Sequence, residues 1–395
     1  MKIKKKVPEL RFPEFSGEWE EKKLGDLVNF YKGKGISKSD LSEQGIPCIL
    51  YGELYTTYGE VINNVKSKTE LKENLFMSKI NDVIIPSSGE TAEDISCASV
   101  VLLDNIALGG DLNILRPSKN IDGCFLSYIL NSSKKKDIAR VSQGISVIHV
   151  YEKGLKQLDI NFPSLPEQQK IGNFFFTLDK RIELQQQKVE NLEKEKKWIM
   201  QKIFSQEIRV KDKNGNDYPE WEKKKLEEMV DSGDVELGRG KVISKRYIEE
   251  NPGNNPVYSS SIINDGIMGY TNDYMFNEEL ITWSIDGGGN FFYRNKHRFS
   301  VTNVSGIMKV NTRKYNYKFI HSQLEILHSQ LKFDYIAKAH PSVIVGIYTL
   351  MLPSLPEQQK IANFLSAFDN KIEKEREKLE QLRELKRGLL QKMFV

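Results

Sequence analysis

A nine-residue segment occurs twice in this chain of 395 residues and divides it into two copies of one unit. Residues 163–171 read PSLPEQQKI, and residues 353–361 repeat them letter for letter at an offset of 190. A weaker repeat opens each half, where Trp19 and Trp221 each begin a Trp-Glu-x-Lys-Lys-Leu pattern. Internal repetition of this kind predicts duplicated structural units. The stretches from each Trp to the next PSLPEQQKI motif are 144 and 132 positions long and differ almost wholly in sequence. One frame with two different inserts indicates one task performed on two different targets.

Each PSLPEQQKI motif opens a segment with the apolar periodicity of a long helix. Steps of four and three from Ile171 and from Ile361 reach apolar residues at eight of ten positions in each segment. Pro166 and Pro356 suit the first turn of these helices, and Glu167 and Glu357 suit the positive end of the helix dipole. Taken from Pro166 to Phe204, the first helix would be about 60 Å long at 1.5 Å per residue. The apolar residues expected to form the helix interface are Phe175, Leu178, Ile182, Val189, Leu192, Ile199, Leu365, Phe368, Ile372, Leu379, Leu382 and Leu389.

Polar residues within the two apolar stripes indicate how the helices pair. A parallel pair would set Lys196 against Lys386, and an antiparallel pair avoids this layer of like charges. We therefore predict an antiparallel coiled coil. The alternative is that each helix packs separately on its own globular domain.

The inserts combine short strands with helices. The β-branched runs at 98–103 and 300–310 predict strands, and the apolar patterns at 125–141 and 317–331 predict helices. We expect two α+β domains related by a pseudo-twofold internal repeat, rather than a doubly wound sheet.

Charge and cysteine content exclude several classes of protein. The net charge is +4, and residues 1–160, 161–207, 208–352 and 353–395 carry 0, +1, +1 and +2, so a polyanion would have to meet a local patch. The longest apolar run, 343–352, is about half the length that spans a bilayer. Cys48, Cys97 and Cys124 form no Cys-x-x-Cys pair, which argues against a disulfide framework and a zinc ribbon. These features predict a soluble protein of the cytoplasm that has no membrane partner.

The framing motifs resemble those of the specificity subunits of bacterial type I restriction-modification systems. The resemblance is carried by PSLPEQQKI opening a long helix, by PELRFPEF and Trp-Glu within 8–20, and by KNGNDYPEW at 213–221, and it covers essentially the whole chain. It implies two target-recognition domains, each reading one half of a split DNA site, with an antiparallel coiled coil that sets the spacer. The boundaries we expect are 1–160 and 208–352 for the recognition domains, and 161–207 and 353–395 for the conserved helical regions.

The resemblance also implies partners and cofactors. Double-stranded DNA, two modification (methyltransferase) subunits and restriction (translocase and nuclease) subunits are the expected partners. S-adenosylmethionine, ATP and Mg²⁺ are expected on those subunits, with neither a cofactor nor a metal on this chain. The sequence agrees, because it contains no Asn-Pro-Pro-Phe/Tyr motif, no P-loop and no His-Glu-x-x-His. The chain is therefore expected to be non-catalytic; the alternative is a tandem-repeat coiled-coil scaffold that binds proteins rather than DNA.

Three groups of residues in the inserts are candidates for DNA contact. The first consists of cations beside glycines, whose bare backbone would let amides approach a phosphate, although a solvated hairpin turn is the alternative. The second consists of small polar loops at strand ends, which suit hydrogen bonds to base edges, although an ordinary loop is the alternative. The third is a basic cluster beside aromatic residues, where phosphate contact is expected if the aromatics are core residues and the cations point outward. The first group comprises Lys32, Lys34 and Lys38 with Arg239, Lys241, Lys245 and Arg246; the second Ser87, Ser88, Glu90 and Thr91 with Asp286 and Asn290; the third Arg294, Lys296 and Arg298.

Overall fold

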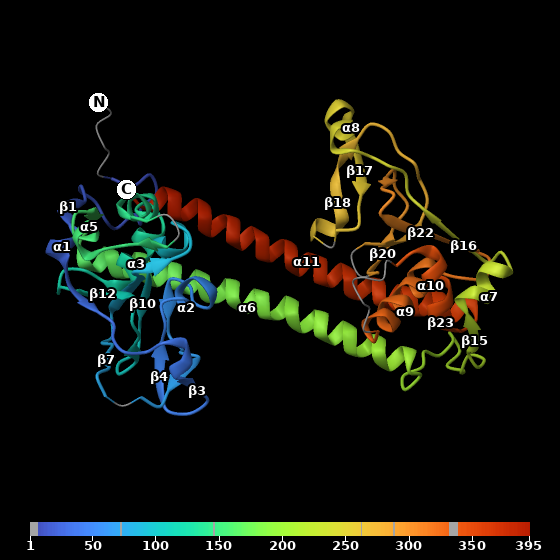
Figure 1. The fold of residues 1–395 in the computed structure, drawn as a ribbon, viewed down its shortest axis with the longest axis horizontal. Coiled ribbons are helices and arrows are strands. Elements are labelled where there is room, and N and C mark those ends of the chain that lie inside the picture. Colours follow the sequence, from blue (N-terminus) through green and yellow to red (C-terminus); the bar gives the residue numbers. More distant parts are fainter. Residues whose placement is uncertain (1–6, 72, 145–146, 262, 287–288, 332–338) are drawn as a thin grey trace. The chain divides into compact units, whose positions relative to one another are not determined.

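The computed structural model describes residues 7–71, 73–144, 147–261, 263–286, 289–331 and 339–395. It divides into two compact units, the first made of residues 1–187 and 376–395 and the second of residues 188–375 (Figure 1). Each unit contains a twisted sheet covered by helices, together with one segment of each of two long helices. The α+β class and the internal repeat are therefore as predicted. Among the described residues, no helix combines the length and apolarity needed to cross a membrane.

The first unit is built around a five-stranded sheet in the order β2-β12-β8-β10-β5. Its neighbouring strands are antiparallel except for the parallel pair β10 and β5. A second sheet follows the order β3-β6-β4-β11-β7, and two-stranded sheets join β1 to β14 and β9 to β13. The strands are β1 (Glu20–Lys23), β2 (Val28–Lys32), β3 (Leu41–Ser42), β4 (Ile46–Ile49), β5 (Val61–Ile62), β6 (Ser67–Thr69), β7 (Phe76–Met77), β8 (Asp82–Pro86), β9 (Ser88–Gly89), β10 (Ser99–Val101), β11 (Ala107–Leu108), β12 (Leu112–Pro117), β13 (Ile148–His149) and β14 (Asp159–Phe162). The short helices are α1 (Leu24–Leu27), α2 (Glu53–Thr56), α3 (Gly123–Asn131), α4 (Lys135–Val141) and α5 (Glu152–Leu155), with 3-10 turns η1 (Lys38–Asp40) and η2 (Asp94–Ser96).

The second unit repeats this plan with fewer strands. Its main sheet has the order β16-β22-β19-β20, which matches β2-β12-β8-β10, and all its neighbours are antiparallel. A three-stranded sheet β18-β17-β21 contains the parallel pair β17 and β21, as β4 and β11 are parallel in the first unit. The strands are β15 (Glu222–Lys225), β16 (Val235–Arg239), β17 (Pro252–Tyr258), β18 (Ile267–Thr271), β19 (Leu280–Ser284), β20 (Phe291–Arg294), β21 (Ser300–Val301), β22 (Ser305–Val310) and β23 (Thr349–Leu352). The helices are α7 (Leu226–Asp231), α8 (Lys245–Glu250), α9 (Tyr317–Ser329) and α10 (Pro341–Ile347), with the 3-10 turn η3 (Ile263–Gly266).

Two of the predicted elements are each divided in the structure. The run 300–310 forms β21 and β22 in different sheets, because a turn in which Ser305 N donates to Thr302 O separates them. The pattern 125–141 forms α3 and α4, which are separated at Ser132, where the backbone leaves the helical region. Periodicity alone does not reveal such breaks, since the apolar spacing continues across them.

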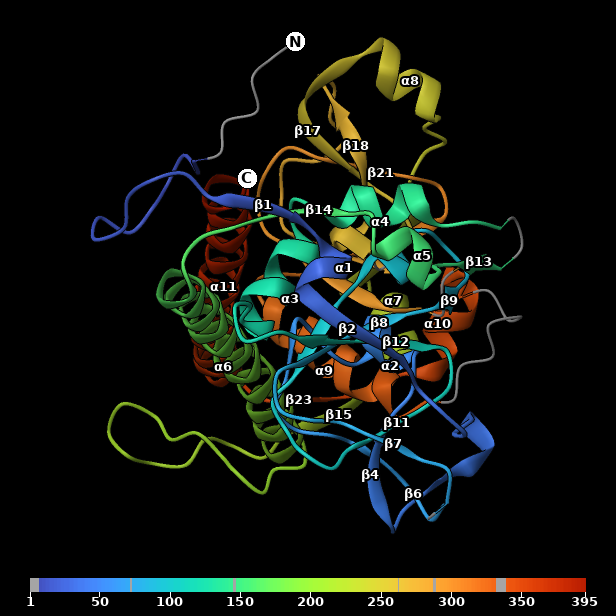
Figure 2. The same cartoon turned by 90° about the vertical axis from the view of Figure 1, so that its left-hand side faces the viewer.

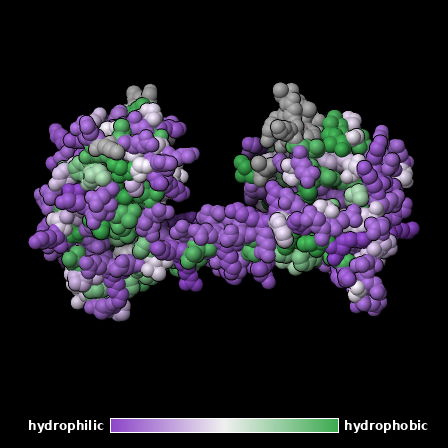
Figure 3. Space-filling model, turned by 90° about the horizontal axis from the view of Figure 1, so that it is seen from below, coloured by the Kyte–Doolittle hydropathy of each residue, from purple (hydrophilic) through white to green (hydrophobic). Residues whose placement is uncertain are grey.

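The two long helices are α6 (Leu165–Phe204) and α11 (Leu355–Met393), and they pair in the predicted antiparallel orientation (Figures 1 and 2). In the first unit the start of α6 packs on the end of α11, where the rings of Phe175 and Phe394 stack with centroids 5.7 Å apart. In the second unit the end of α6 packs on the start of α11. Of the twelve expected interface residues, seven are buried and Ile182, Ile199, Phe368, Leu382 and Leu389 are half-buried. The surface of these helices seen in Figure 3 is mostly hydrophilic, with some hydrophobic patches; the exposed apolar residues of the two helices include Leu184, Trp198 and Leu385.

The repeated PSLPEQQKI motif fastens each long helix to its globular part. Gln168 is buried; its Oε1 accepts from Asp122 N (3.0 Å), and its Nε2 donates to Asn120 O (3.0 Å) and Pro163 O (2.8 Å). Gln358 makes the equivalent bonds to Asn316 N, Lys314 O and Pro353 O. In both units the side chain therefore joins the start of the long helix to the N-cap residue of an earlier helix, Asp122 of α3 or Asn316 of α9.

The preceding glutamates are also buried, and each meets an arginine from the segment before the Trp. Arg11 donates to both carboxylate oxygens of Glu167 at 2.7 Å. Glu357 accepts from Trp221 Nε1 (3.0 Å) and lies 3.7 Å from Arg209. In both units an arginine that precedes the Trp therefore binds the glutamate of PSLPEQQKI, and in the second unit the Trp of the weaker repeat binds it as well.

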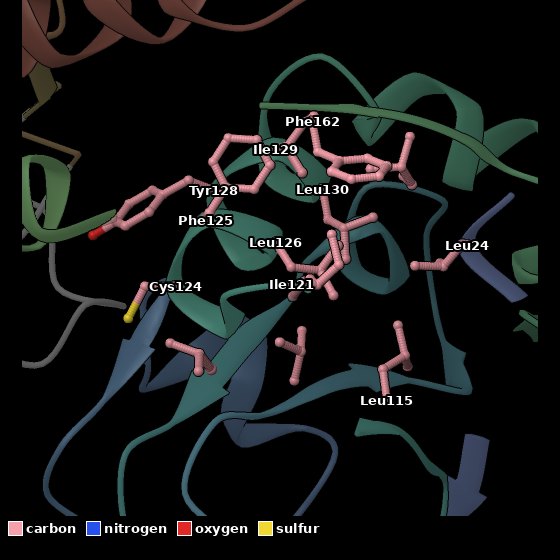
Figure 4. Packing of buried hydrophobic residues seen from close by; sticks show 14 of the residues in the cluster. Leu24, Leu115, Ile121, Cys124, Phe125, Leu126, Tyr128, Ile129, Leu130 and Phe162 are labelled. Carbon is pink, nitrogen blue, oxygen red and sulfur yellow. The ribbon is translucent and has the colours of Figure 1, made fainter. Parts of the chain in front are cut away.

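The core of the first unit lies between α3 and the main sheet (Figure 4). Phe125, Tyr128 and Ile129 of α3 are fully buried, and Trp19 packs edge-on against Phe125 with ring centroids 5.7 Å apart. Burial of each such side chain contributes roughly 1.5–3 kcal/mol. α3 therefore covers one face of the sheet, and the loops at the ends of the sheet extend from this packed core.

Candidate DNA interface

In the first unit, two of the predicted DNA-contacting loops meet at one end of the main sheet. Lys32 Nζ donates to Asn113 Oδ1 (2.6 Å), and Asn113 Nδ2 donates to Val150 O (3.1 Å). Val150 N in turn donates to Ser87 O (3.0 Å), and Ser87 N donates to Asp111 O (2.7 Å). The end of β2, the start of β12 and the segment after β8 are thus joined in one hydrogen-bonded network.

The second unit brings the corresponding loops together in the same way. Arg239 Nη2 donates to Asn303 O (2.7 Å), and Ile285 N donates to the next carbonyl, that of Val304 (3.0 Å). Lys241 N donates to Val301 O (3.0 Å), which matches the bond from Lys34 N to Leu108 O (3.0 Å) in the first unit. Lys32 and Lys34 therefore occupy positions in the first unit that are equivalent to those of Arg239 and Lys241 in the second.

The glycines between these cations have a structural explanation that the sequence did not reveal. A Cβ on Gly33 would lie 1.8 Å from Gly109 O, and a Cβ on Gly240 would lie 2.1 Å from Val301 O. The bare backbone is therefore required by close approach of the chain to itself. By contrast, a Cβ on Gly238 would meet no atom within 4 Å.

Most of the predicted cations at this end of the sheet are open to solvent. Lys34, Lys38, Lys241 and Lys245 are exposed, and the exposed Arg246 pairs with Glu250 at 2.7 Å. The side chain of Lys32 is also exposed, but its ammonium end lies against the buried Asn113. Desolvation lowers the pKa of Lys32, and the charges of Asp111 and Glu152 oppose this shift.

The second predicted group is only partly exposed. Ser87 and Ser88 are buried, and Ser88 pairs with His149 between β9 and β13, so this segment is a covered strand and not the surface loop expected. Glu90 and Thr91 are exposed, with Thr91 Oγ1 accepting from Asp94 N (3.1 Å). Asp286 and Asn290 of the second unit are exposed, while Gly287 and Gly288 between them lie outside the described residues.

The third predicted group departs from expectation at Arg294. Its side chain is buried, and its Nη1 donates to Asp265 Oδ2 (2.7 Å). The prediction that this cation points outward is therefore wrong. Lys296 and Arg298 are exposed, and Arg298 lies over the ring of Tyr274 at 5.0 Å. Because Arg294 pairs with Leu280 at the opposite end of β19 from Ser284, the cluster does not join the Asp286 loop.

Sequence reasoning missed a cavity at the same end of the first sheet. It has a volume of about 530 Å³ and is lined by Ile36, Lys38, Tyr51, Tyr55 and Asp111 among others. Burial raises the pKa of Tyr55 in this cavity, and the charges of Tyr51, Asp94 and Glu90 add to the shift.

Two sequence signals could have pointed to this region. Asn113 interrupts the apolar run 112–115, which suggests a buried polar group with dedicated partners. Asp111 follows two glycines, which is typical of a turn, and the structure places it in the left-handed region with a φ of 57°.

Among the described residues, no group of three His, Cys, Asp or Glu side chains is arranged to hold a metal ion.

Comparison with known proteins identifies the family. Residues 16–194 and 218–384 match the type I restriction modification DNA specificity domain, one match in each half of the chain. A Mycoplasma pneumoniae protein assigned as a type I specificity subunit is 33% identical over 219 residues, which cover 54% of this chain and 84% of that protein. The specificity subunit of the MpnII type I restriction enzyme from the same organism is 38% identical over 138 residues, covering 34% and 41%.

The fold agrees with these sequence matches. The crystal structure of a type I restriction-modification S subunit from M. genitalium superposes with a TM-score of 0.66 at 19% identity, over 98% of this chain and 99% of that one. The duplicated sheet, the antiparallel helices and both sequence matches lead to one conclusion. The chain belongs to the type I restriction modification DNA specificity family.

Proposed function

We propose that this chain is the DNA specificity subunit of a type I restriction-modification complex and that it reads a bipartite, asymmetric site, one half with each unit. The observation that carries this proposal is the sheet end that both units build from equivalent hydrogen bonds. Cations recur there, as Lys32 and Lys34 in one unit and Arg239 and Lys241 in the other. The neighbouring residues differ, with 87–91 reading SSGET and 285–290 reading IDGGGN. Shared cations suit phosphate contacts that position the DNA, and differing side chains suit base contacts that specify it.

The chain is proposed to be non-catalytic and to act through partner subunits. Two methyltransferase subunits would carry S-adenosylmethionine and modify adenine, and restriction subunits would use ATP and Mg²⁺. The absence of the corresponding motifs from the sequence supports this division of labour. We also propose residues 1–160 and 208–352 as the recognition domains and 161–207 and 353–395 as the helical regions.

The charge of the chain predicts its behaviour toward DNA. With 58 basic against 54 acidic residues, the isolated chain has little excess positive charge for phosphate neutralisation, which supplies much of the affinity of DNA-binding proteins. We therefore expect weak DNA binding by the chain alone and tight binding by the assembled complex.

Methylome sequencing of a host that carries the locus tests the proposal. One bipartite adenine-methylated motif should be present and should disappear when this chain is deleted, while methylation by other systems persists. Replacing residues 31–142 with the corresponding insert of a relative should change one half of the motif and leave the other half intact. An unchanged set of methylated motifs after deletion would exclude the proposed function.

A further inference from the structure

The second unit contains a buried arginine that holds a surface turn. Arg294 is 2% exposed, and its guanidinium carbon lies 3.7 Å from the ring centroid of Tyr258 and 4.7 Å from that of Phe292. Its Nη1 donates to Asp265 Oδ2 (2.7 Å) and its Nη2 to Asp265 O (3.0 Å). Burying a guanidinium costs free energy unless its partners are well placed. An ordinary surface turn does not need a buried arginine to hold it, so this arrangement calls for an explanation.

The turn that Arg294 holds has an unusual backbone. Asn264 and Asp265 have φ values of 51° and 52°, and Gly266 follows with +79°. Two consecutive non-glycine residues in the left-handed region are unfavourable, although Asn and Asp tolerate it better than most L-amino acids and Gly266 adopts it freely. Such strain persists where the surrounding structure enforces it, and it is concentrated at functional sites.

The turn follows the end of β17 in the three-stranded sheet, and backbone hydrogen bonds in β21 and just after it link that end to the cations of the main sheet, since Lys241 N donates to Val301 O (3.0 Å). Ser259 N donates to Gly266 O (2.7 Å) and closes the loop, and the carbonyl of the preceding Tyr258 accepts from Thr302 N (2.9 Å). The adjacent Asn303 is the residue whose carbonyl accepts from Arg239.

The first unit uses the corresponding position in a similar way. Ile49 O accepts from Gly109 N (2.9 Å), as Tyr258 O accepts from Thr302 N, and the chain after Ile49 lines the cavity that contains Lys38 and Asp111. In each unit, therefore, the segment after this strand begins beside the cations of the candidate DNA interface.

The side chains that the turn presents suit the edges of bases. Ile263 is 78% exposed and Asn264 is exposed, while Asp265 is occupied by Arg294. A carboxamide offers a donor and an acceptor to a base edge, and an aliphatic group packs on the methyl of thymine. The ion pair with Arg294 also balances a carboxylate that would otherwise repel phosphates.

We propose that the turn of residues 263–266 is a base-reading element of the second unit and that Arg294 is the residue that positions it. This inference rests on the proposed function, and it assigns Asn264 and Ile263 to base contact in a groove of duplex DNA. Arg294 itself acts through Asp265 and does not contact DNA.

Three conservative variants test the inference in the reconstituted complex with its methyltransferase subunits. Asn264→Asp keeps the size and the left-handed preference of the residue but removes the amide donor. Asp265→Asn and Arg294→Lys weaken the ion pair between Arg294 and Asp265. Both variants approximately retain the side-chain volume, and Arg294→Lys also retains the positive charge. Asn254→Asp is the matched control, since Asn254 is exposed near the opposite end of β17.

The readout is methylation of a DNA library randomised at both half-sites, together with thermal melting to confirm folding. We expect each of the three variants to lose about tenfold discrimination at one or more positions of one half-site, with the other half-site read as in the wild type. The control should match the wild type at both. Unchanged reading of both half-sites by the folded variants would overturn the inference, and so would equal loss at both, which indicates a general assembly defect. Absence of any bipartite motif with the wild-type complex would instead refute the proposed function, on which the inference depends.

Discussion

Lys386 of α11 forms an ion pair with Asp179 of α6, with Nζ and Oδ1 2.6 Å apart. The same ammonium group lies 2.9 Å from Glu60 Oε1, and Tyr128 OH donates to Asp179 Oδ2 at 2.7 Å. Two carboxylates therefore share one lysine in the first unit. Burial and the charge of Glu60 raise the pKa of Asp179 above its ordinary value.

The second unit contains the equivalent ion pair, but there one carboxylate is shared by two lysines. Asp369 and Lys196 stand 190 positions from Asp179 and Lys386, and they pair at 2.6 Å. Lys318 Nζ also lies 2.6 Å from Asp369, so one carboxylate has two lysines. Burial would raise the pKa of Asp369, but the hydrogen bonds from the two lysines outweigh it, and the pKa lies below its ordinary value.

The two equivalent aspartates should therefore respond differently to neutralisation. A lowered pKa means that Asp369 stabilises the fold above the unfolded value of 3.8, and that this contribution is lost as the pH falls through the lowered value. A raised pKa means the opposite for Asp179, whose contribution is complete below 3.8 and is lost as the pH rises through the raised value. At pH 7 we expect Asp369→Asn to cost about 1–2 kcal/mol of unfolding free energy and Asp179→Asn to cost less.

Urea unfolding at several pH values measures both effects. The difference between Asp369→Asn and the wild type should shrink as the pH falls toward and below 3.8, because the wild-type carboxylate becomes protonated as well. Equal losses for the two variants at pH 7 would show that the charge balance around the two aspartates does not matter.

The long helices illustrate what the sequence alone could predict. The preference of proline for the first helical turn placed the start of the first helix at Pro166, within one residue of its observed start at Leu165, and the positions of Lys196 and Lys386 indicated the antiparallel orientation. The partners of those lysines were not predicted, because Asp179 and Asp369 lie beside the apolar stripe and a count of seam positions passes over them. A pattern within one helix determines its buried face, but not which residue of another helix lies opposite.

The candidate interface was harder to predict because its residues depend on contacts between distant segments. Arg294 looks like part of an exposed basic cluster until Asp265 and Tyr258, each roughly thirty residues or more away in the sequence, are seen to enclose it. Ser88 looks like a loop residue until His149 pairs with it. Such two-residue strands leave no periodic signal, so the sequence located the interface region but not the exposure of each side chain.

Gln168 should matter far more to stability than its neighbour Gln169. Replacing Gln168 with Ala removes three hydrogen bonds and leaves Asp122 N, Asn120 O and Pro163 O without this partner, at a cost of about 2–4 kcal/mol. Gln169 is exposed, so Gln169→Ala should change the unfolding free energy by less than about 0.5 kcal/mol. Urea denaturation followed by circular dichroism gives both numbers, and similar values for the two variants would contradict the role assigned to the motif.

Gly240→Ala distinguishes a structural role of the glycine from direct approach to a phosphate. The new Cβ would meet Val301 O and Thr302 O at 2.1 and 2.3 Å, so we expect a loss of about 2–3 kcal/mol in unfolding free energy even without DNA. Gly238→Ala is the control, because its Cβ would enter open space and should change stability by less than about 0.5 kcal/mol. Thermal melting of the DNA-free protein distinguishes the two roles of Gly240. A Gly240→Ala variant that melts like the wild type but binds DNA poorly would show that the glycine is needed for approach of the backbone to a phosphate.

Lys34 offers the most direct test of the cationic sheet end, because its exposed side chain can be removed without disturbing the fold. If Lys34 contacts a phosphate, Lys34→Ala should weaken DNA binding by the assembled complex equally for all sequences. It should also reduce the slope of log affinity against log salt concentration by about one. Lys119 is the matched control, since it is exposed two residues beyond the other end of β12, roughly 20 Å along the strand from the interface. Fluorescence anisotropy at four salt concentrations gives both slopes. An unchanged slope for Lys34→Ala, or the same reduction for Lys119→Ala, would place the phosphate contacts elsewhere on the unit.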